Sequence, residues 1–207
     1  MQHVTHTSSK TPWNKNKIIG QKLPLKPEQI WSIRVRLEMQ NNVRDLALFN
    51  LALDSKLRAC DLVKLMVRDI SHGGGILSRA QIIQQKTKQP VQFEITKKTR
   101  LALEDWISYA NLNFHDYLFK GRSRIREHLS TRQYARIVDH WVTSIGLDSN
   151  AYGTHSMRRT KASIIYKKTK NLRAIQILLG HTKLESTVRY LGVEIDDALD
   201  ISEHIEI

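Results

Sequence analysis

Two stretches near the C-terminus decide how this chain folds: GTHSMRRTKASIIY (153–166) and ILLGHTKLESTVRYL (177–191). In the first, His155 and Arg158 stand three residues apart at the start of a predicted helix, so both side chains project from one face and can meet a common anion. The second contains Tyr190. Taken alone, a tyrosine on a short helix is more often a packed aromatic than a reactive group. The combination is rarer, and its meaning depends on the rest of the chain.

Upstream of these stretches, three glycines at 73–75 break a helical pattern, and the chain becomes β-prone. The segments ILSRAQIIQQ (76–85) and VQFEI (91–95) are separated by KTKQP (86–90). Two β-prone runs around a short polar segment predict a hairpin, here with a basic tip.

The remaining sequence is typical of helices. Pro27 suits a first helical turn because proline there sacrifices no intrahelical hydrogen bond, and Ile30, Ile33 and Leu37 follow at helical spacing. Further helices are expected at about 43–53, 58–67, 97–111, 131–144, 155–168, 171–179, 185–191 and 196–203. The predicted fold class is α+β, mainly helical, with one small antiparallel sheet or hairpin. No internal repeat and no interior linker rich in Pro, Gly or Ser suggests a second domain.

Composition narrows the choice of partners. Thirty-three Lys and Arg against 20 Asp and Glu give a formal net charge of +13 and a pI near 10.0. This balance favours a polyanion, and nucleic acid fits better than an anionic membrane, although many ordinary basic proteins share it. No apolar run approaches the ~18 residues of a membrane span, and no signal peptide is recognised. We expect a soluble, cytoplasmic, DNA-associated protein.

Cys60 is the only cysteine of the chain. An intramolecular disulfide and a cysteine-based metal cage are therefore excluded, which suits a reducing compartment.

The order of the polar residues resembles the tyrosine recombinase, or phage-integrase-like, family. Its pattern is an arginine with a nearby acid, a hairpin lysine, H-x-x-R, L-G-H and finally a tyrosine. The chain meets this pattern, over about 26–195, at Arg58 with Asp61, Lys86, His155 and Arg158, Leu179-Gly180-His181, and Tyr190. The resemblance implies a catalytic domain in which Tyr190 attacks a DNA phosphodiester and forms a covalent 3′-phosphotyrosyl link.

The two arginines and the tyrosine fit this chemistry. Attack on a phosphodiester builds charge on the non-bridging oxygens, which planar guanidiniums bind bidentately, so Arg58 and Arg158 are the expected stabilisers. A tyrosine hydroxyl has an ordinary pKa of about 10 and needs positive charge or a base nearby before it attacks at neutral pH.

The other polar residues supply proton transfer and hydrogen bonding. His155 is the candidate base, and His181 the candidate donor to a phosphate oxygen. Lys86, at the hairpin tip, is the candidate general acid for the departing 5′ oxygen, with Lys88 as the fallback. Asp61 is expected either to orient Arg58 through a salt bridge or to be a surface acid.

We expect no metal and no other cofactor. The chain has no H-x3-H, no acidic cluster of the two-metal type among the candidate residues and no P-loop. A phosphotyrosyl bond retains the energy of the broken phosphodiester, so the same site can reseal DNA in reverse.

Two positions depart from the family's usual form. Asp54, Ser55 and Lys56 stand where Thr-Gly or similar is common, and Arg159 stands where His is common. Arg159 is expected either to contact a neighbouring phosphate or to be a solvated surface arginine.

The two ends of the chain differ in charge. Residues 1–25 are expected to form a flexible basic arm, and Lys10, Lys15, Lys17 and Lys22, together with Lys88 and Arg159, are the candidate DNA-binding residues. Residues 26–207 form the expected catalytic domain. Its acidic tail, at about 194–207, is expected to dock on an adjacent protomer or to fold back on its own domain. Family members typically carry an N-terminal helical clamp domain, which 26 residues cannot form.

The leading hypothesis is a minimal site-specific recombinase, metal- and ATP-independent, acting as an integrase, an excisionase-partnered recombinase or an invertase. Its expected partners are double-stranded DNA, further copies of the chain as a dimer or tetramer on DNA, and accessory DNA-bending proteins. The alternatives are a catalytically silent DNA-binding regulator and a type IB topoisomerase-like nicking-closing enzyme.

Overall fold

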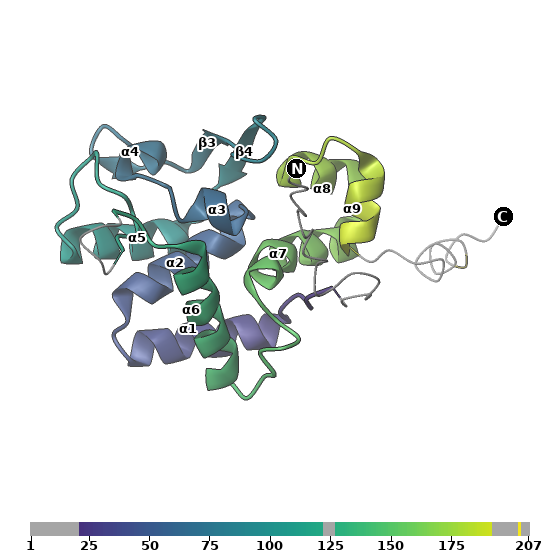
Figure 1. The fold of residues 1–207 in the computed structure, drawn as a ribbon, viewed down its shortest axis with the longest axis horizontal. Coiled ribbons are helices and arrows are strands. Elements are labelled where there is room, and N and C mark those ends of the chain that lie inside the picture. The colour runs from purple at the N-terminus through teal and green to yellow at the C-terminus, as the bar shows by residue number, and fades with distance from the viewer. Residues whose placement is uncertain (1–20, 122–126, 192–202, 204–207) are drawn as a thin grey trace, which may run out of the picture.

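The computed structural model describes residues 21–121, 127–191 and 203 of the chain. Within these ranges the elements, in chain order, are α1 (Pro27–Met39), α2 (Val43–Ser55), α3 (Ala59–Leu62), α4 (Val67–Ile70), β1 (Ser71–His72), β2 (Gly75–Ile76), β3 (Arg79–Ile83), β4 (Pro90–Glu94), α5 (Lys97–Tyr109), α6 (Thr131–Ser144), α7 (Thr154–Thr169), α8 (Leu172–Leu179) and α9 (Leu184–Leu191). The predicted fold class is confirmed: helices predominate, with small antiparallel sheets (Figure 1). No helix in the described ranges is long and apolar enough to cross a membrane.

Helix α2 is the central element of the fold. Its sequence, VRDLALFNLALDS, is apolar on nearly every side, and every residue from Ala47 to Ser55 is buried. A helix that is apolar all round must be covered on all sides, and α1, α5 and α7 pack against it. The helix begins at the N-cap Asn42, whose side chain accepts a hydrogen bond from the Asp45 amide.

The hairpin predicted from the β-prone runs is confirmed. Strands β3 and β4 pair antiparallel, with Arg79 opposite Glu94 and Ile83 opposite Pro90. Alternate side chains of the pair, including Val91 and Phe93 of β4, face the core. The turn at 84–89 therefore projects beyond the paired strands, where it can carry polar side chains.

A second, smaller hairpin was not predicted. The glycines that break the helical pattern form the turn between β1 and β2, where Gly73 and Gly74 both adopt positive φ. Glycine is the residue that adopts this left-handed conformation without a Cβ penalty, and two such residues in succession suit a tight β-turn.

The helix predicted over 58–67 is wrong, because two short helices, α3 and α4, stand in its place. Between them the backbone pairs with a distant segment: the Leu118 amide donates to the Leu65 carbonyl at 2.8 Å, and the Val67 amide donates to the Asp116 carbonyl at 3.0 Å. These backbone groups are used across the fold and cannot also continue one helix. The other predicted helices are confirmed to within a few residues, except that at 196–203, which lies almost wholly outside the described residues.

The core has two parts. The larger one joins α1 to α6 with the β3–β4 hairpin and contains Phe49, Phe93, Phe119, Tyr134 and Trp141. These aromatic side chains bury large apolar areas, which is the main favourable contribution to folding.

The smaller part of the core lies among α7, α8 and α9, which Figure 1 shows together at one end of the molecule. Ala162, Tyr166, Ile175 and Leu179 are buried there, and Tyr190 packs against them while remaining partly exposed. Helix α9 therefore rests on a small apolar cluster and not on the main core.

The segment before α1 is held against α7. The Leu23 amide donates to the Ala151 carbonyl at 2.9 Å, the Leu25 amide donates to Thr160 Oγ1 at 2.9 Å, and the Leu25 side chain is buried. The packed chain therefore begins before Lys26. Lys10, Lys15 and Lys17 lie outside the described residues, as does the acidic tail apart from Glu203.

Candidate active site

The C-terminal motif residues converge in space. Helix α7 carries His155 and Arg158, and α9 brings Tyr190 back beside them. The Arg158 Cζ lies 5.9 Å from the centroid of the Tyr190 ring, and the His181 ring meets that ring edge-on at 5.3 Å. The Tyr190 hydroxyl donates to the His155 carbonyl at 3.4 Å. Residues predicted to act together therefore do form one cluster.

Arg158 is buried and held by backbone carbonyls. Its Nη2 donates to the Leu179 carbonyl at 2.6 Å, and its Nη1 donates to the Lys56 carbonyl. Burial lowers the Arg158 pKa to about 10, so the group remains a cation at neutral pH. None of the ion pairs among the described residues includes Arg158. Its charge is oriented without a carboxylate partner, an arrangement suited to an incoming anion.

Arg58 lies at the start of α3 and is held by a residue that the sequence analysis did not select. Its Nη1 donates to Gln84 Oε1 at 2.7 Å. The salt bridge expected from Asp61 is not formed: Asp61 is buried, and its Oδ1 accepts a hydrogen bond from the Gln85 amide at 2.9 Å. Asp61 therefore ties the hairpin turn to α3, and its other carboxylate oxygen has no partner among the described residues.

Burial raises the Tyr190 pKa to about 12, while the nearby charges of Arg158, Arg159 and Arg58 oppose that rise. The hydroxyl is therefore protonated at neutral pH in the free protein. An acceptor for its proton is needed before the oxygen can attack.

Both candidate histidines are neutral at pH 7. The pKa of His155 is lowered by burial and then by the charges of Arg158, Arg159, Arg58 and Lys86. The pKa of His181 is lowered to about 4, again by burial and then by the arginines. A neutral imidazole can accept a proton, as the role proposed for His155 requires.

His181 follows the end of α8, and its Nδ1 lies 3.1 Å from the hydroxyl of Thr187 on α9. When the Thr187 hydroxyl donates to Nδ1, the ring proton resides on Nε2 and is available to a phosphate oxygen. The pair also ties the L-G-H segment to the helix that carries Tyr190.

The hairpin turn carries both candidate acids on exposed positions. Lys86 is among the charges that lower the His155 pKa, so the turn brings its ammonium group toward the site. Lys88 adopts a left-handed backbone with φ of +55°. The proximity of Lys86 to His155 favours Lys86 over Lys88 as the proton donor.

The surface alternative for Arg159 is wrong, because this side chain is buried. Its Nη1 donates to the Lys22 carbonyl at 2.7 Å, and its Cζ lies 5.4 Å from the centroid of the Tyr190 ring. The Lys22 ammonium in turn donates to the Asn150 carbonyl. Arg159 therefore links the segment before α1 to the tyrosine helix.

The departure at Asp54-Ser55-Lys56 has a structural basis. Lys56 adopts φ of +54°, a conformation that a glycine adopts without strain. Its side chain is fully buried, and its Nζ binds both carboxylate oxygens of Glu94 at 2.9 Å. The left-handed turn directs the Lys56 carbonyl to Arg158.

The Lys56 ammonium belongs to a cluster of buried and partly buried charges that was not predicted from the sequence. The Lys161 Nζ contacts Asp54 and Glu94, each at 2.6 Å. The second oxygen of Asp54 accepts hydrogen bonds from the Thr96 amide and hydroxyl and from the Thr99 hydroxyl. The members of this cluster come from positions as far apart as Asp54 and Lys161. Spacing between neighbouring residues therefore could not reveal it.

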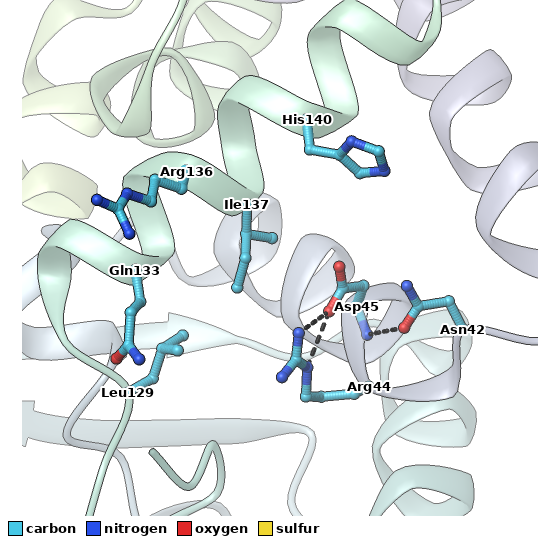
Figure 2. A pocket seen from close by; sticks show the side chains of 8 residues that line it. All are labelled: Asn42, Arg44, Asp45, Leu129, Gln133, Arg136, Ile137 and His140. Carbon is cyan, nitrogen blue, oxygen red and sulfur yellow. Dashed lines mark hydrogen bonds and ion pairs between the residues drawn. The ribbon is translucent and has the colours of Figure 1, made fainter. Parts of the chain in front are cut away.

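A pocket of about 430 Å³ lies away from this site, between the start of α2 and α6 (Figure 2). Its floor contains the ion pair between Arg44 and Asp45, and Asp45 also accepts from the Trp141 ring nitrogen at 3.1 Å. The hydrogen bond between Trp141 and Asp45 joins α6 to α2. A second pocket, of about 450 Å³, is lined by Gln21, Lys22, His155, Arg159, Ser186, Arg189 and Tyr190.

Across the described ranges, no three His, Cys, Asp or Glu side chains gather in a way that could hold a metal ion. The expectation of a cofactor-free site stays a prediction.

Known proteins with similar sequences are integrases and recombinases. Residues 25–195 match the Phage integrase family. The chain is 28% identical over 169 residues to the probable integrase/recombinase YoeC of Bacillus subtilis, covering 82% of this chain and 88% of the relative. It is 30% identical over 188 residues to a tyrosine recombinase of Pseudothermotoga lettingae, covering 90% of this chain and 62% of the relative.

Solved structures share the fold. The XerA recombinase superposes with a TM-score of 0.72 at 17% identity, over 91% of this chain and 67% of that one. The XerH recombinase in its post-cleavage complex with a palindromic difH substrate gives 0.68 at 19% identity, over 89% and 54%. The chain thus spans roughly half to two thirds of several longer relatives. The chain belongs to the phage integrase family, the tyrosine recombinases, enzymes that break and rejoin DNA.

Proposed function

We propose that this chain is a site-specific DNA recombinase or integrase that cleaves and rejoins DNA through a 3′-phosphotyrosyl intermediate on Tyr190. The observation that carries the proposal is that the guanidiniums of Arg158 and Arg159, both buried, lie within 5.9 Å and 5.4 Å of the Tyr190 ring centroid, and that the ring also contacts His181. The charges of Arg158 and Arg159 favour the phenolate that attack requires.

In the cleavage step, the Tyr190 oxygen attacks the scissile phosphorus, and the bond from phosphorus to the 5′ oxygen breaks. His155 accepts the phenolic proton, and Lys86 donates a proton to the departing 5′ oxygen. The products are a phosphotyrosyl bond and a free 5′ hydroxyl. Attack by a 5′ hydroxyl on this bond, with the two proton transfers reversed, rejoins the strand and releases Tyr190.

Charge stabilisation comes from the guanidiniums. Arg58 and Arg158 bind the non-bridging oxygens as negative charge grows there, and His181 donates a further hydrogen bond. Because Arg158 is held by two carbonyls before DNA arrives, little reorganisation is needed during the reaction. Asp61 supports the arrangement by holding the turn that carries Lys86.

Double-stranded DNA is the proposed substrate. Support comes from the net charge of +13 and from relatives such as XerH and the Tn1549 integrase, which were solved bound to DNA. Assembly as a dimer or tetramer on DNA, accessory DNA-bending proteins and a cytoplasmic, DNA-associated location belong to the same proposal. DNA binding should weaken steeply with added salt, because phosphate contacts release counterions.

The deciding experiment is covalent trapping. The protein is incubated with a library of nicked duplexes from which the cleaved fragment diffuses away, and denaturation-resistant adducts are separated and sequenced. We expect wild type and Tyr166→Phe, the matched control from the same apolar cluster, to form adducts, and Tyr190→Phe to form none.

An adduct formed equally by Tyr190→Phe would refute the nucleophile. Absence of any adduct with wild type would favour a silent DNA-binding regulator. Relaxation of supercoiled plasmid on every sequence, without strand exchange, would favour a topoisomerase-like enzyme.

A further inference from the structure

Gln84 stands at the end of β3, where the hairpin turn begins, and its side chain is completely buried. A buried primary amide must find partners for both its oxygen and its nitrogen. Those partners come from three separate parts of the site.

The amide oxygen faces the first arginine. Gln84 Oε1 accepts from Arg58 Nη1 at 2.7 Å and from the Thr87 hydroxyl at 2.8 Å. One oxygen therefore fixes the guanidinium and the middle of the hairpin turn together.

The backbone of Gln84 closes the turn that carries Lys86. Its amide donates to the Gln89 carbonyl at 2.9 Å, and its carbonyl accepts from the Lys88 amide at 2.9 Å. The position of Lys86 is thereby tied to the same residue that holds Arg58.

The amide nitrogen faces the L-G-H segment. Gln84 Nε2 donates to the Leu179 carbonyl at 3.4 Å, and that carbonyl also accepts from Arg158 Nη2 at 2.6 Å. A continuous series of contacts thus runs from Arg58 through Gln84 and the Leu179 carbonyl to Arg158.

Gly180 makes this approach possible. It adopts φ of +62°, and a Cβ there would lie 3.1 to 3.3 Å from the three terminal atoms of the Gln84 amide. A Cβ there would require the amide to move by a few tenths of an ångström, and the positive φ also favours glycine.

We propose that Gln84 is a positioning residue that sets Arg58, the Lys86 turn and the Leu179 carbonyl in register around the reacting phosphate. This inference rests on the proposed function. The amide suits the task because it accepts and donates while remaining neutral. A carboxylate could not donate to Leu179, and its negative charge between the arginines would oppose phosphate binding.

The kinetic test compares two neighbouring glutamines. Gln84→Met retains side-chain bulk but loses every side-chain hydrogen bond. Gln85→Met is the matched control, because Gln85 Nε2 ties the same turn to the Cys60 carbonyl at 2.7 Å without touching an arginine. We expect Gln84→Met to lower single-turnover cleavage roughly 100-fold with little change in DNA affinity, as a small misplacement of catalytic groups does. Gln85→Met should stay within about threefold of wild type, by the same reasoning.

A double-variant cycle separates positioning from general loosening. If Gln84 acts through Arg58, adding Gln84→Met to Arg58→Ala should lower cleavage little further. Losses that multiply in full would overturn the proposal, because they would mean that Gln84 does not act through Arg58.

A second measurement needs no activity. In ¹⁵N-labelled protein, the guanidinium signals of Arg58, assigned by their loss in Arg58→Lys, should be resolved and slow to exchange in wild type and in Gln85→Met. In Gln84→Met they should broaden or exchange rapidly. Unchanged signals in Gln84→Met would refute the positioning role.

The two measurements also separate this inference from the proposed function. If wild type forms no adduct while the Arg58 signals depend on Gln84, the proposed function fails and the positioning contact stands. If wild type forms the adduct while Gln84→Met matches Gln85→Met in cleavage and in signals, the positioning role alone fails.

Discussion

Two groups of cations meet at Lys56, and they differ in whether carboxylates neutralise them. In the first, Lys56 and Lys161 are matched by Asp54 and Glu94. In the second, Arg158 donates to the Lys56 and Leu179 carbonyls and has no acid in ion-pair contact among the described residues. Lys56 connects the two groups. Its ammonium binds Glu94 in the ion-paired group, and its backbone carbonyl accepts a hydrogen bond from Arg158.

The pKa shifts reflect the ion pairing only in part. The acids hold the Lys161 pKa above its ordinary value, and the lysines hold the pKa values of Asp54 and Glu94 below theirs. Burial nevertheless lowers the pKa of Lys56, although the carboxylate of Glu94 opposes that shift. Around Tyr190, burial and mutual repulsion lower the pKa values of Arg158, His155 and His181. Compensated charge belongs to the framework, whereas uncompensated positive charge marks the place where an anion is expected.

The largest effect should come from the uncompensated group. Arg158→Ala removes a guanidinium aimed at the developing phosphate charge, and we expect single-turnover cleavage to fall roughly 1,000-fold or more. The control is Arg173→Ala, an exposed arginine on α8, which should cleave as wild type does. Equal cleavage by both variants would contradict a role for the Arg158 charge in the reaction.

The compensated group should affect stability first. Asp54→Ala removes the acceptor of Lys161, Thr96 and Thr99, and we expect a loss of about 3 kcal/mol in the free energy of unfolding. Urea unfolding gives this value, and cleavage is assayed where the variant remains folded. A large drop in cleavage with unchanged stability would show that this cluster acts in the reaction.

A smaller effect is expected where Arg159 links Lys22 to the Tyr190 ring. Arg159→Met keeps an extended apolar side chain and loses both contacts. Because a buried cation–π contact contributes on the order of 2 kcal/mol, we expect cleavage to fall about 10-fold or more. Arg189→Met, on the exposed side of α9, is the control, and a similar loss there would point to general disturbance of the helix.

The smallest effect concerns pH. The His181 pKa is about 4 in the folded chain and near 6.5 when unfolded, so the unfolded state binds more protons between these values. His181 therefore lowers the free energy of unfolding as pH decreases from about 6.5 to 4. The slope of that free energy against pH corresponds to the uptake of at most one proton on unfolding. His181→Gln should flatten the unfolding free energy against pH in that window. An unchanged slope would contradict the lowered pKa.

Local patterns predicted most of the secondary structure, since helix spacing and strand alternation are properties of neighbouring residues. The helix predicted over 58–67 failed because Leu65 and Val67 use their backbone groups to pair with a segment some 50 residues away. The solvated alternative for Arg159 failed for a related reason: its burial depends on the segment before α1 and on Tyr190.

The candidate site also contains residues that the sequence predicts and residues that only the tertiary structure reveals. The catalytic candidates were predictable because their order along the chain matches a family pattern. Gln84 and Lys56 were not, because nothing in QQKTKQ or DSKLR reveals that one side chain reaches Arg58 and Leu179 or that the other lies buried against Glu94.

By itself, then, the sequence determined the identities and order of the reactive groups, the helical character of the chain and its positive charge. Only the tertiary structure decided which of those charges are neutralised. Pairing depends on contacts between residues as far apart as Asp54 and Lys161, and burial makes each such contact, or its lack, count far more than it would in water. This is why Lys56 and Lys161 belong to the framework while Arg158 lies beside Tyr190, the candidate nucleophile.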